Sequence, residues 1–204
     1  PLDSRKIFIG GQDVSKLCAH RRAQFIARVF QDPMIGTAPT MTIGENMLLA
    51  ELRGKQRSFA YGLTTSRRAR YSKQLAELNL GLENRLDMQV GLLSGGQRQS
   101  LSLVMAVSTH PKLLLLDEHT AALDPRTAKL VMDTTVRAVD GLKLTTMMVT
   151  HNMEHAINYG NRIIMMDAGK VLVDIGPEEK RGITVMDLID RFHTKSDAIA
   201  LQGA

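Results

Sequence analysis

The chain has 204 residues, of which 44% are hydrophobic and 23% charged, and it carries a formal net charge of +5. This is an ordinary composition for a globular domain with a sizeable core, and no apolar run approaches the roughly 18 residues that span a bilayer. Cys18 is the single cysteine, which excludes a disulfide within the chain and favours a reducing compartment.

The positive net charge permits nucleic acid or an anionic membrane surface as a neighbour but establishes neither. The densest basic cluster is Arg67, Arg68 and Arg70 with Lys73. No aromatic side chain interleaves usefully with this cluster, so we interpret it as a solvated helix face and expect no nucleic-acid partner.

The first elements predicted along the chain are short. Lys6–Ile9 predicts a strand that ends at a glycine pair, and residues 16–25 predict a short helix. Ile26–Phe30 predicts a second strand, which stops before Pro33 because proline cannot donate to a strand ladder.

Residues 42–92 predict helices and no clear strand, like an insertion between elements of a sheet. Thr42 and Glu45 match a capping box at the start of one helix. A second helix is predicted over Ser66–Leu80, with Gly81 as its stop. Its apolar positions at helical spacing are Tyr71, Leu75 and Leu78.

The second half of the chain alternates helices with strands. Ser94 caps a predicted helix, and the continuously apolar run Leu113–Leu116 predicts a strand covered on both faces of a parallel sheet. Asp124, followed by proline, starts another helix. Further predicted elements are a strand at Thr145–Thr150, a hairpin of Arg162–Asp167 with Lys170–Asp174, and a short helix at Val185–Phe192. This order indicates an α/β fold with a largely parallel sheet.

Two groups of polar residues point to phosphate chemistry. Ser94, Gly95 and Gly96 open a helix, where free amides and a partial positive charge bind anions, although a plain helix cap has the same pattern. Asp117 and Glu118 end the apolar strand, where a carboxylate suits Mg²⁺ and a second one can activate water. The structural alternative is that two acids simply end a strand at the surface.

Two further candidates also follow predicted strands. Gln31 could ligate a metal or water through its amide oxygen, and His151 could touch a terminal phosphate. Gln31 alone is uninformative, and a histidine after a strand is more often structural.

Together, these segments resemble the ATP-binding subunits of ABC transporters. The matching motifs are VFQDP (Val29–Pro33, the Q-loop), LSGGQRQ (Leu93–Gln99, the signature), LLLLDE (Leu113–Glu118, Walker B), AALD (Ala121–Asp124, the D-loop) and VTH (Val149–His151, the switch histidine). The five motifs occur in the family's order. The resemblance implies a P-loop NTPase-type α/β core formed by residues 1–33 and 111–204, with a helical subdomain at 34–110 that ends in the signature helix.

The resemblance also implies catalytic and metal-binding roles. Gln31 would sense Mg²⁺ and the attacking water, and pass that state to a membrane partner. Asp117 would hold Mg²⁺ through water, Glu118 would be the general base, and His151 would contact the γ-phosphate of ATP.

The signature residues have a different implied role, towards ATP held by the opposite subunit. Ser94, Gly95 and Gly96 would hold its γ-phosphate, Gln97 belongs to the same nucleotide-binding motif, and Asp124 would line the dimer interface. The implied protein hydrolyses ATP to drive solute transport, in the direction of import, at the cytoplasmic face of the membrane. Its implied partners are a second ATP-binding subunit, permease subunits and a substrate-binding protein.

The sequence departs from the family pattern in two places. His119 stands where the family usually has proline or alanine. The printed chain also has no G-x-x-x-x-G-K-[S/T] loop, since neither of its Gly-Lys pairs fits that pattern. We therefore expect an N-terminal truncation, and a chain that by itself neither binds ATP tightly nor hydrolyses it.

Two alternatives remain open on the sequence. One is a non-catalytic regulatory half-site. The other is an ABC-type ATPase head that acts on nucleic acid or the ribosome, which would carry long coiled-coil insertions, whereas the segment between Gln31 and Ser94 is short. Within the family, the region around His151 is most similar to ATPases of poorly characterised importers, some tied to amino-acid uptake.

Overall fold

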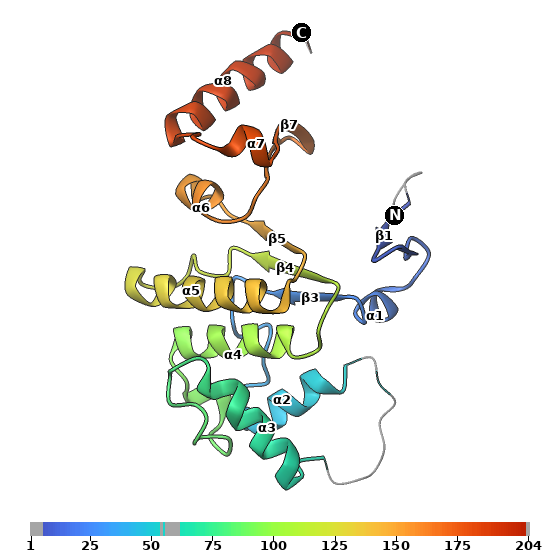
Figure 1. Ribbon diagram of the computed structural model, residues 1–204, viewed down its shortest axis with the longest axis vertical. Helices are drawn as coiled ribbons and strands as arrows, with labels where there is room; N and C mark the ends of the chain where they lie inside the picture. Colours follow the sequence, from blue (N-terminus) through green and yellow to red (C-terminus); the bar gives the residue numbers. More distant parts are fainter. Residues whose placement is uncertain (1–5, 54, 56–61, 203–204) are drawn as a thin grey trace. The chain divides into compact units, whose positions relative to one another are not determined.

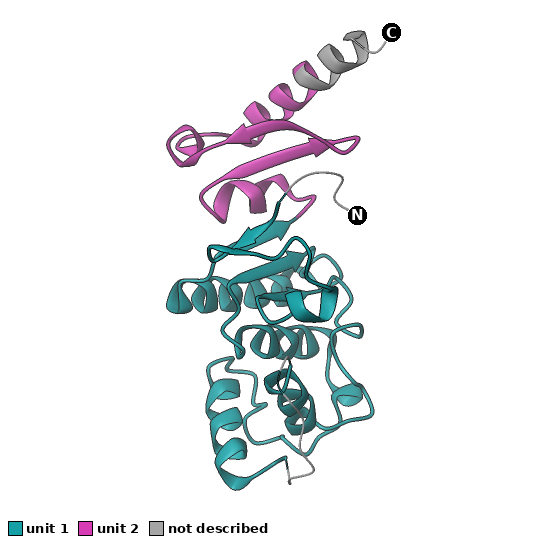
Figure 2. Ribbon diagram, turned by 90° about the vertical axis from the view of Figure 1, so that its right-hand side faces the viewer, with its two compact units in different colours: residues 1–149 teal, residues 150–204 magenta. Residues whose placement is uncertain are grey.

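The computed structural model describes residues 6–53, 55 and 62–202. The chain forms two compact units, residues 1–149 and residues 150–204, which Figure 2 colours separately. Each unit has a hydrophobic core of its own. None of the helices in the described part is long and apolar enough to cross a membrane.

A three-stranded parallel sheet forms the centre of the first unit. Its strands are β3 (Ile26–Val29), β4 (Leu113–Asp117) and β5 (Thr146–Val149), with β4 in the middle. Helices α4 (Gly95–Val107) and α5 (Pro125–Leu142) pack against each other, and α4 also packs on β3. The predicted α/β arrangement with a parallel sheet is confirmed.

The chain enters the first unit through short elements. A two-residue turn at Gly10 and Gly11, both with positive φ, joins β1 (Phe8–Ile9) to β2 (Gln12–Asp13) in an antiparallel pair. The predicted helix before β3 is shorter than expected, because α1 spans only Ala19–Arg22.

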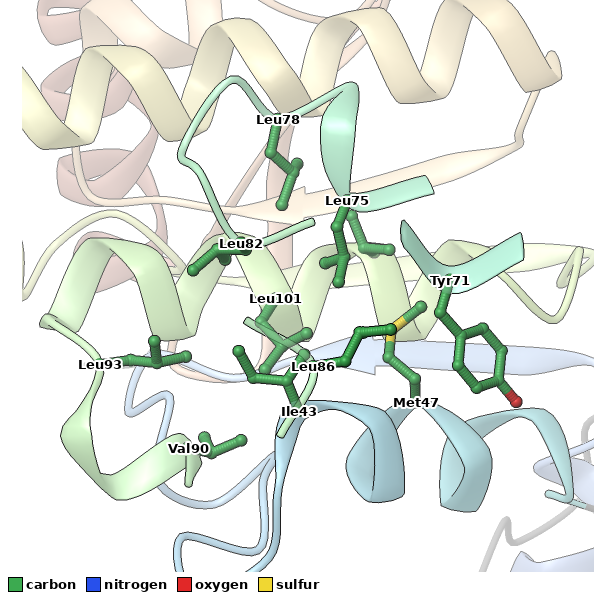
Figure 3. Close-up of a cluster of buried hydrophobic side chains, with 11 residues drawn as sticks. Ile43, Met47, Tyr71, Leu75, Leu78, Leu82, Leu86, Val90, Leu93 and Leu101 are labelled. Carbon is green, nitrogen blue, oxygen red and sulfur yellow. The ribbon is translucent and has the colours of Figure 1, made fainter. Parts of the chain in front are cut away.

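A second core in the same unit lies among α2 (Ile43–Glu51), α3 (Thr65–Ala76), the 3₁₀ turn η1 (Val90–Leu92) and α4. Figure 1 shows α2 and α3 beside α4, and Figure 3 shows apolar side chains of these helices converging. The capping box of Thr42 and Glu45 is confirmed.

The predicted end of the α3 helix was wrong. The helix stops at Ala76, not at Leu80, and the chain turns through a left-handed residue, Asn79. This early turn brings both Leu78 and Leu82 into the core, where each is almost fully buried. The free energy gained by burying these two leucines therefore outweighs the free energy of continuing the helix.

The second unit contains α6 (Met153–Asn158), β6 (Ile163–Asp167), β7 (Lys170–Ile175), α7 (Pro177–Lys180) and α8 (Val185–Gln202). Strands β6 and β7 form the predicted antiparallel hairpin, so that prediction is confirmed. Helix α8 is longer than the predicted short helix, and the sequence pattern did not predict α6 or α7.

The basic cluster on α3 is held largely by ion pairs. Arg67 and Arg70 both pair with Glu51 of α2, and Arg68 pairs with Asp87. The hydroxyl of Tyr71 donates to Oε2 of Glu51 at 2.5 Å. Burial alone would raise the pKa of Glu51, but the bonds from Tyr71 and Arg70 dominate and lower it, while burial and Glu51 raise the pKa of Tyr71 to about 12.

We predict that Glu51 contributes stability at neutral pH that disappears in acid. Because its folded pKa lies below the ordinary value of 4.5, the contribution is present above that value and is lost as pH falls through the folded pKa. Urea unfolding should therefore show Glu51→Gln less stable than wild type at neutral pH, with the difference shrinking below pH 4.5. Exposed Glu77→Gln is the control, and a pH-independent difference would contradict the prediction.

Candidate functional site

Parallel pairing places the first group of candidate residues at one edge of the sheet. Val29 of β3 lies opposite Leu116 of β4, so the residues that follow each strand leave the sheet at the same end. Gln31 follows β3 and is exposed, while Asp117 and Glu118 end β4 and are partly exposed. We call Gln31, Asp117 and Glu118 the strand-end cluster.

Arg28 of β3 holds the carboxylate of Asp117. The guanidinium of Arg28 forms an ion pair with Oδ2 of Asp117, and it lies 4.6 Å from the ring centroid of Phe30. The Asp117 side chain is 37% exposed, so the pair is open to solvent and its contribution to stability is small. Sequence reasoning missed Arg28, because the contact joins residues 89 positions apart.

Glu118 has a strained backbone, with φ at +44°. Its N–H donates to the carbonyl of Val149 at 3.0 Å, and its own carbonyl accepts from Ala121 N at 2.9 Å. Only a few per cent of non-glycine residues adopt positive φ, at a cost of order 1–3 kcal/mol where it is strained, and such residues concentrate at functional sites. Bonds on both sides therefore hold Glu118 in a conformation that it would otherwise rarely adopt.

His119 anchors this turn to α5. The imidazole is 2% exposed, and Nε2 lies 3.1 Å from Oγ1 of Thr135. That hydroxyl already donates to the carbonyl of Val131 at 2.8 Å, so Nε2 of His119 is the donor in their bond. The departure from the family pattern at position 119 is thus a buried structural contact, which sequence reasoning did not identify.

The second group of candidate residues lies where α4 and α5 begin. The hydroxyl of Ser94 accepts from Gln97 N at 3.3 Å, and Oε1 of Gln97 accepts from Ser94 N at 3.1 Å, so the two form a capping box. Ser94 and Gly95 are exposed, whereas Gly96 is buried. With Asp124, described next, we call these residues the helix-start cluster.

Asp124, the member of the helix-start cluster on α5, is the N-cap of that helix. Its Oδ1 accepts from Thr127 N at 3.1 Å, and hydrogen bonds from Thr127 lower the pKa of Asp124. A methyl group added at Gly96 would place its Cβ 2.0 Å from Cγ2 of Thr127, while one at Gly95 would make ordinary contact with Leu123 at 3.6 Å. Gly96 therefore allows α4 to start close against α5.

The buried side-chain amide of Gln99 links the helix-start cluster to the strand-end cluster. Gln99 of α4 is fully buried, and its Nε2 donates to the carbonyl of Phe30 at 2.9 Å. Phe30 immediately precedes Gln31, so the first turns of α4 are tied to the chain that leads into the strand-end cluster. Sequence reasoning did not single out Gln99, because a glutamine five residues into a helix carries no signal of burial.

His151 belongs to the second unit. It is exposed and lies just before α6, whose N-cap Asn152 accepts from His155 N at 3.1 Å. The cap explains why helix α6 begins where it does.

Comparison with known proteins identifies the family. A family model described as "ABC transporter" matches residues 2–121, which is more than half of the chain. The chain belongs to the ABC transporter family. The VFQDP, LSGGQRQ and LLLLDE motifs all lie in the matched part.

Relatives place the chain among the ATP-binding subunits of ABC transporters. It is 43% identical to a tyrosine transport ATP-binding protein of Clostridioides difficile, over 93% of this chain and 75% of that protein. It is 32% identical to the methionine import ATP-binding protein MetN 2 of Pseudomonas entomophila, over 84% of this chain but only 49% of that protein.

A solved structure supports the same assignment. The ATP-binding cassette MJ0796, a dimer in a post-hydrolysis state bound to ADP and Pi, matches with a TM-score of 0.69 and 27% identity. The match covers 86% of this chain and 74% of that one. The ABC ATPase fold, a P-loop NTPase-type α/β fold, is therefore confirmed, and the chain is an ATPase subunit of this family.

We predict that Gly96 is required for the full stability of this ABC ATPase subunit. Gly96→Ala should lower the free energy of unfolding by about 1–3 kcal/mol, because the new Cβ overpacks against Thr127. Gly95→Ala, which meets no close contact, is the matched control. Thr127→Ser removes Cγ2, so the double variant should recover most of the loss in urea unfolding. A stable single variant, or no recovery in the double variant, would refute this packing.

Proposed function

We propose that this subunit hydrolyses ATP at the strand-end cluster to drive the import of an amino acid through a partner permease. The observation that carries the proposal is Glu118, held with positive φ beside Asp117 at the end of β4. A backbone fixed in this way limits where the Glu118 carboxylate can lie before ATP arrives, which suits a general base. Gln31, at the end of the neighbouring strand, would orient the attacking water.

The donor set at the strand-end cluster fits Mg²⁺. The oxygens of Asp117 and Gln31 are of the hard type that this ion prefers, and both residues reach solvent. Asp117 would hold the ion through water, and the ion would neutralise phosphate charge. Arg28 pairs with the same carboxylate and therefore competes with the cation for it. The family motif implies that His151 would contact the γ-phosphate.

The helix-start cluster would act on ATP held by a second copy of the subunit. Ser94 and Gly95 are exposed at the first turn of α4, where amides and the helix dipole favour a phosphate, and Gln97 keeps that turn capped. Asp124 is exposed beside them and would line the dimer interface. The dimeric cassette similar to this chain supports a homodimer.

The permease would dock on the helical part of the first unit. A groove of about 370 Å³ lies between the segment after β3, helix α2 and helix α4. The segment contains Gln31, so a docked permease would be close to the residue that senses the nucleotide. We retain residues 34–110 as the helical subdomain and residues 1–33 and 111–204 as the ATPase core.

Amino acids are the proposed class of solute because one relative is a tyrosine transport protein and another a methionine import protein. The subunit would work peripherally at the cytoplasmic face of the membrane, with a substrate-binding protein delivering the solute.

We predict that Glu118→Gln abolishes hydrolysis without abolishing ATP binding. The amide keeps the size of the side chain but cannot accept a proton, so turnover should fall by about 10²-fold or more. The assay uses the full-length protein, with phosphate release measuring turnover and equilibrium binding measuring affinity for ATP. Exposed Glu77→Gln is the control. Turnover within about twofold of wild type would remove Glu118 from the role of general base.

A further inference from the structure

Arg28 lies on the face of the sheet that does not pack against helix α4. Its neighbours in β3, Ala27 and Val29, are buried in the core that the sheet shares with α4, and successive residues of a strand point to opposite faces. Arg28 therefore projects from the other face, where its side chain is 49% exposed. Its charge does not serve the hydrophobic core and needs a different explanation.

Asp117 lies on the same face of the sheet as Arg28, closer to the carboxyl edge. Arg28 is opposite Leu115 in the parallel register, and Asp117 follows Leu115 by two residues, so the two charged side chains share a face. The guanidinium reaches along the sheet to Oδ2 of Asp117. It consequently lies at the strand ends, where parallel sheets of α/β folds bind their ligands.

The ring of Phe30 supports this guanidinium. The guanidinium carbon of Arg28 lies 4.6 Å from the ring centroid, which is within the range of a cation–π contact. The carbonyl of Phe30 accepts a hydrogen bond from the buried Gln99, and this bond fixes the backbone that carries the ring. Stacking on an aromatic ring uses the face of a guanidinium and leaves the N–H groups at its edge available.

Most of the donor groups of Arg28 are unused. A guanidinium has five N–H donors, and within the described residues the only hydrogen bond of this side chain is the one from Nη2 to Asp117. Both side chains of the pair are substantially exposed, so the pair contributes little to stability. Arg28 can therefore exchange Asp117 for a stronger partner at small cost.

A bound nucleotide supplies such a partner. An ion that Asp117 holds through water binds phosphate oxygens directly, so these oxygens come close to the carboxylate that Arg28 already reaches. ATP with one Mg²⁺ still has a net negative charge, and Asp117 and Glu118 add negative charge at the same edge. Arg28 offers a positive charge there, and arginine binds phosphate through two parallel hydrogen bonds.

We propose that Arg28 is a phosphate-binding residue, whose guanidinium leaves Asp117 when Mg²⁺ takes that carboxylate and then binds a phosphate oxygen of the same ATP. The inference rests on the proposed function, because it adds a residue to the nucleotide site at the strand-end cluster. Without nucleotide, Arg28 pairs with Asp117 and keeps this carboxylate in place. The ring of Phe30 supports the guanidinium in both states.

Equilibrium binding of ATP to the full-length protein in the presence of Mg²⁺ tests the proposal. Arg28→Met removes the charge and the donors but keeps an unbranched side chain, and it should weaken binding by about tenfold or more. Arg28→Lys retains the charge without the planar fork and should lose less. Arg21→Met, the same change at an exposed arginine of α1, should bind as wild type does.

Two further measurements separate phosphate binding from packing. Thermal unfolding of Arg28→Met without nucleotide should match wild type, because the ion pair that it removes is exposed. The difference in ATP affinity between wild type and Arg28→Met should shrink as the salt concentration rises, because salt screens the attraction between the guanidinium and phosphate.

Three results would overturn the proposal. Tighter binding by Arg28→Met would mean that the guanidinium only competes with Mg²⁺ for Asp117. Binding by Arg28→Met that is indistinguishable from wild type would mean that the guanidinium does not contact ATP. Equal losses in Arg28→Met and Arg28→Lys would mean that altered packing, and not the charge, weakens binding.

Asp117→Asn distinguishes this inference from the proposed function. An amide is a poorer partner than a carboxylate for hydrated Mg²⁺, so this variant should need a higher Mg²⁺ concentration to bind ATP. If it does and Arg28→Met binds as wild type does, the strand-end cluster is the nucleotide site and the role of Arg28 is wrong. If both variants bind as wild type does, the strand-end cluster is not the nucleotide site, and both proposals fail.

Discussion

The parallel pairing of β4 with β3 and β5 is the constraint on which the rest of the site depends. It brings the ends of β3 and β4 to one edge, and the carbonyl of Val149, the last residue of β5, accepts a hydrogen bond from Glu118 N. The apolar run of β4 makes this pairing favourable, since Leu114 and Leu116 are almost fully buried. The stability of the paired strands thereby holds the backbone of Glu118 at positive φ.

Helix α4 packs both against the paired strands and in the helical core. Its Leu101 and Val104 pack in the helical core, whereas Leu103 and Val107 pack against the sheet. Gln99 of the same helix donates to the carbonyl of Phe30, so the helix start at the proposed dimer contact and the chain before Gln31 are joined by one helix and one hydrogen bond.

The local features of this fold could be predicted from the sequence, while contacts between distant residues could not. The capping box at Thr42 and the apolar strand β4 depend on neighbouring residues, so spacing alone indicates them. The pairing of Arg28 with Asp117 and the close approach of Gly96 to α5 depend on the tertiary fold, and no local pattern specifies them. The family motifs indicated the candidate residues. They did not indicate the positive φ of Glu118, which supports this residue as the candidate for a base.

The central claim is that each catalytic site combines the strand-end cluster of one copy with the helix-start cluster of the other. Mixed dimers of the gene product that carry Ser94→Arg and Glu118→Gln test it most directly by their ATPase rates. With the two changes on different copies, one complete site survives and activity remains. With both changes on one copy facing a wild-type partner, neither site is complete and activity is lost. The reverse pattern would contradict the account, because each copy would then act with its own residues.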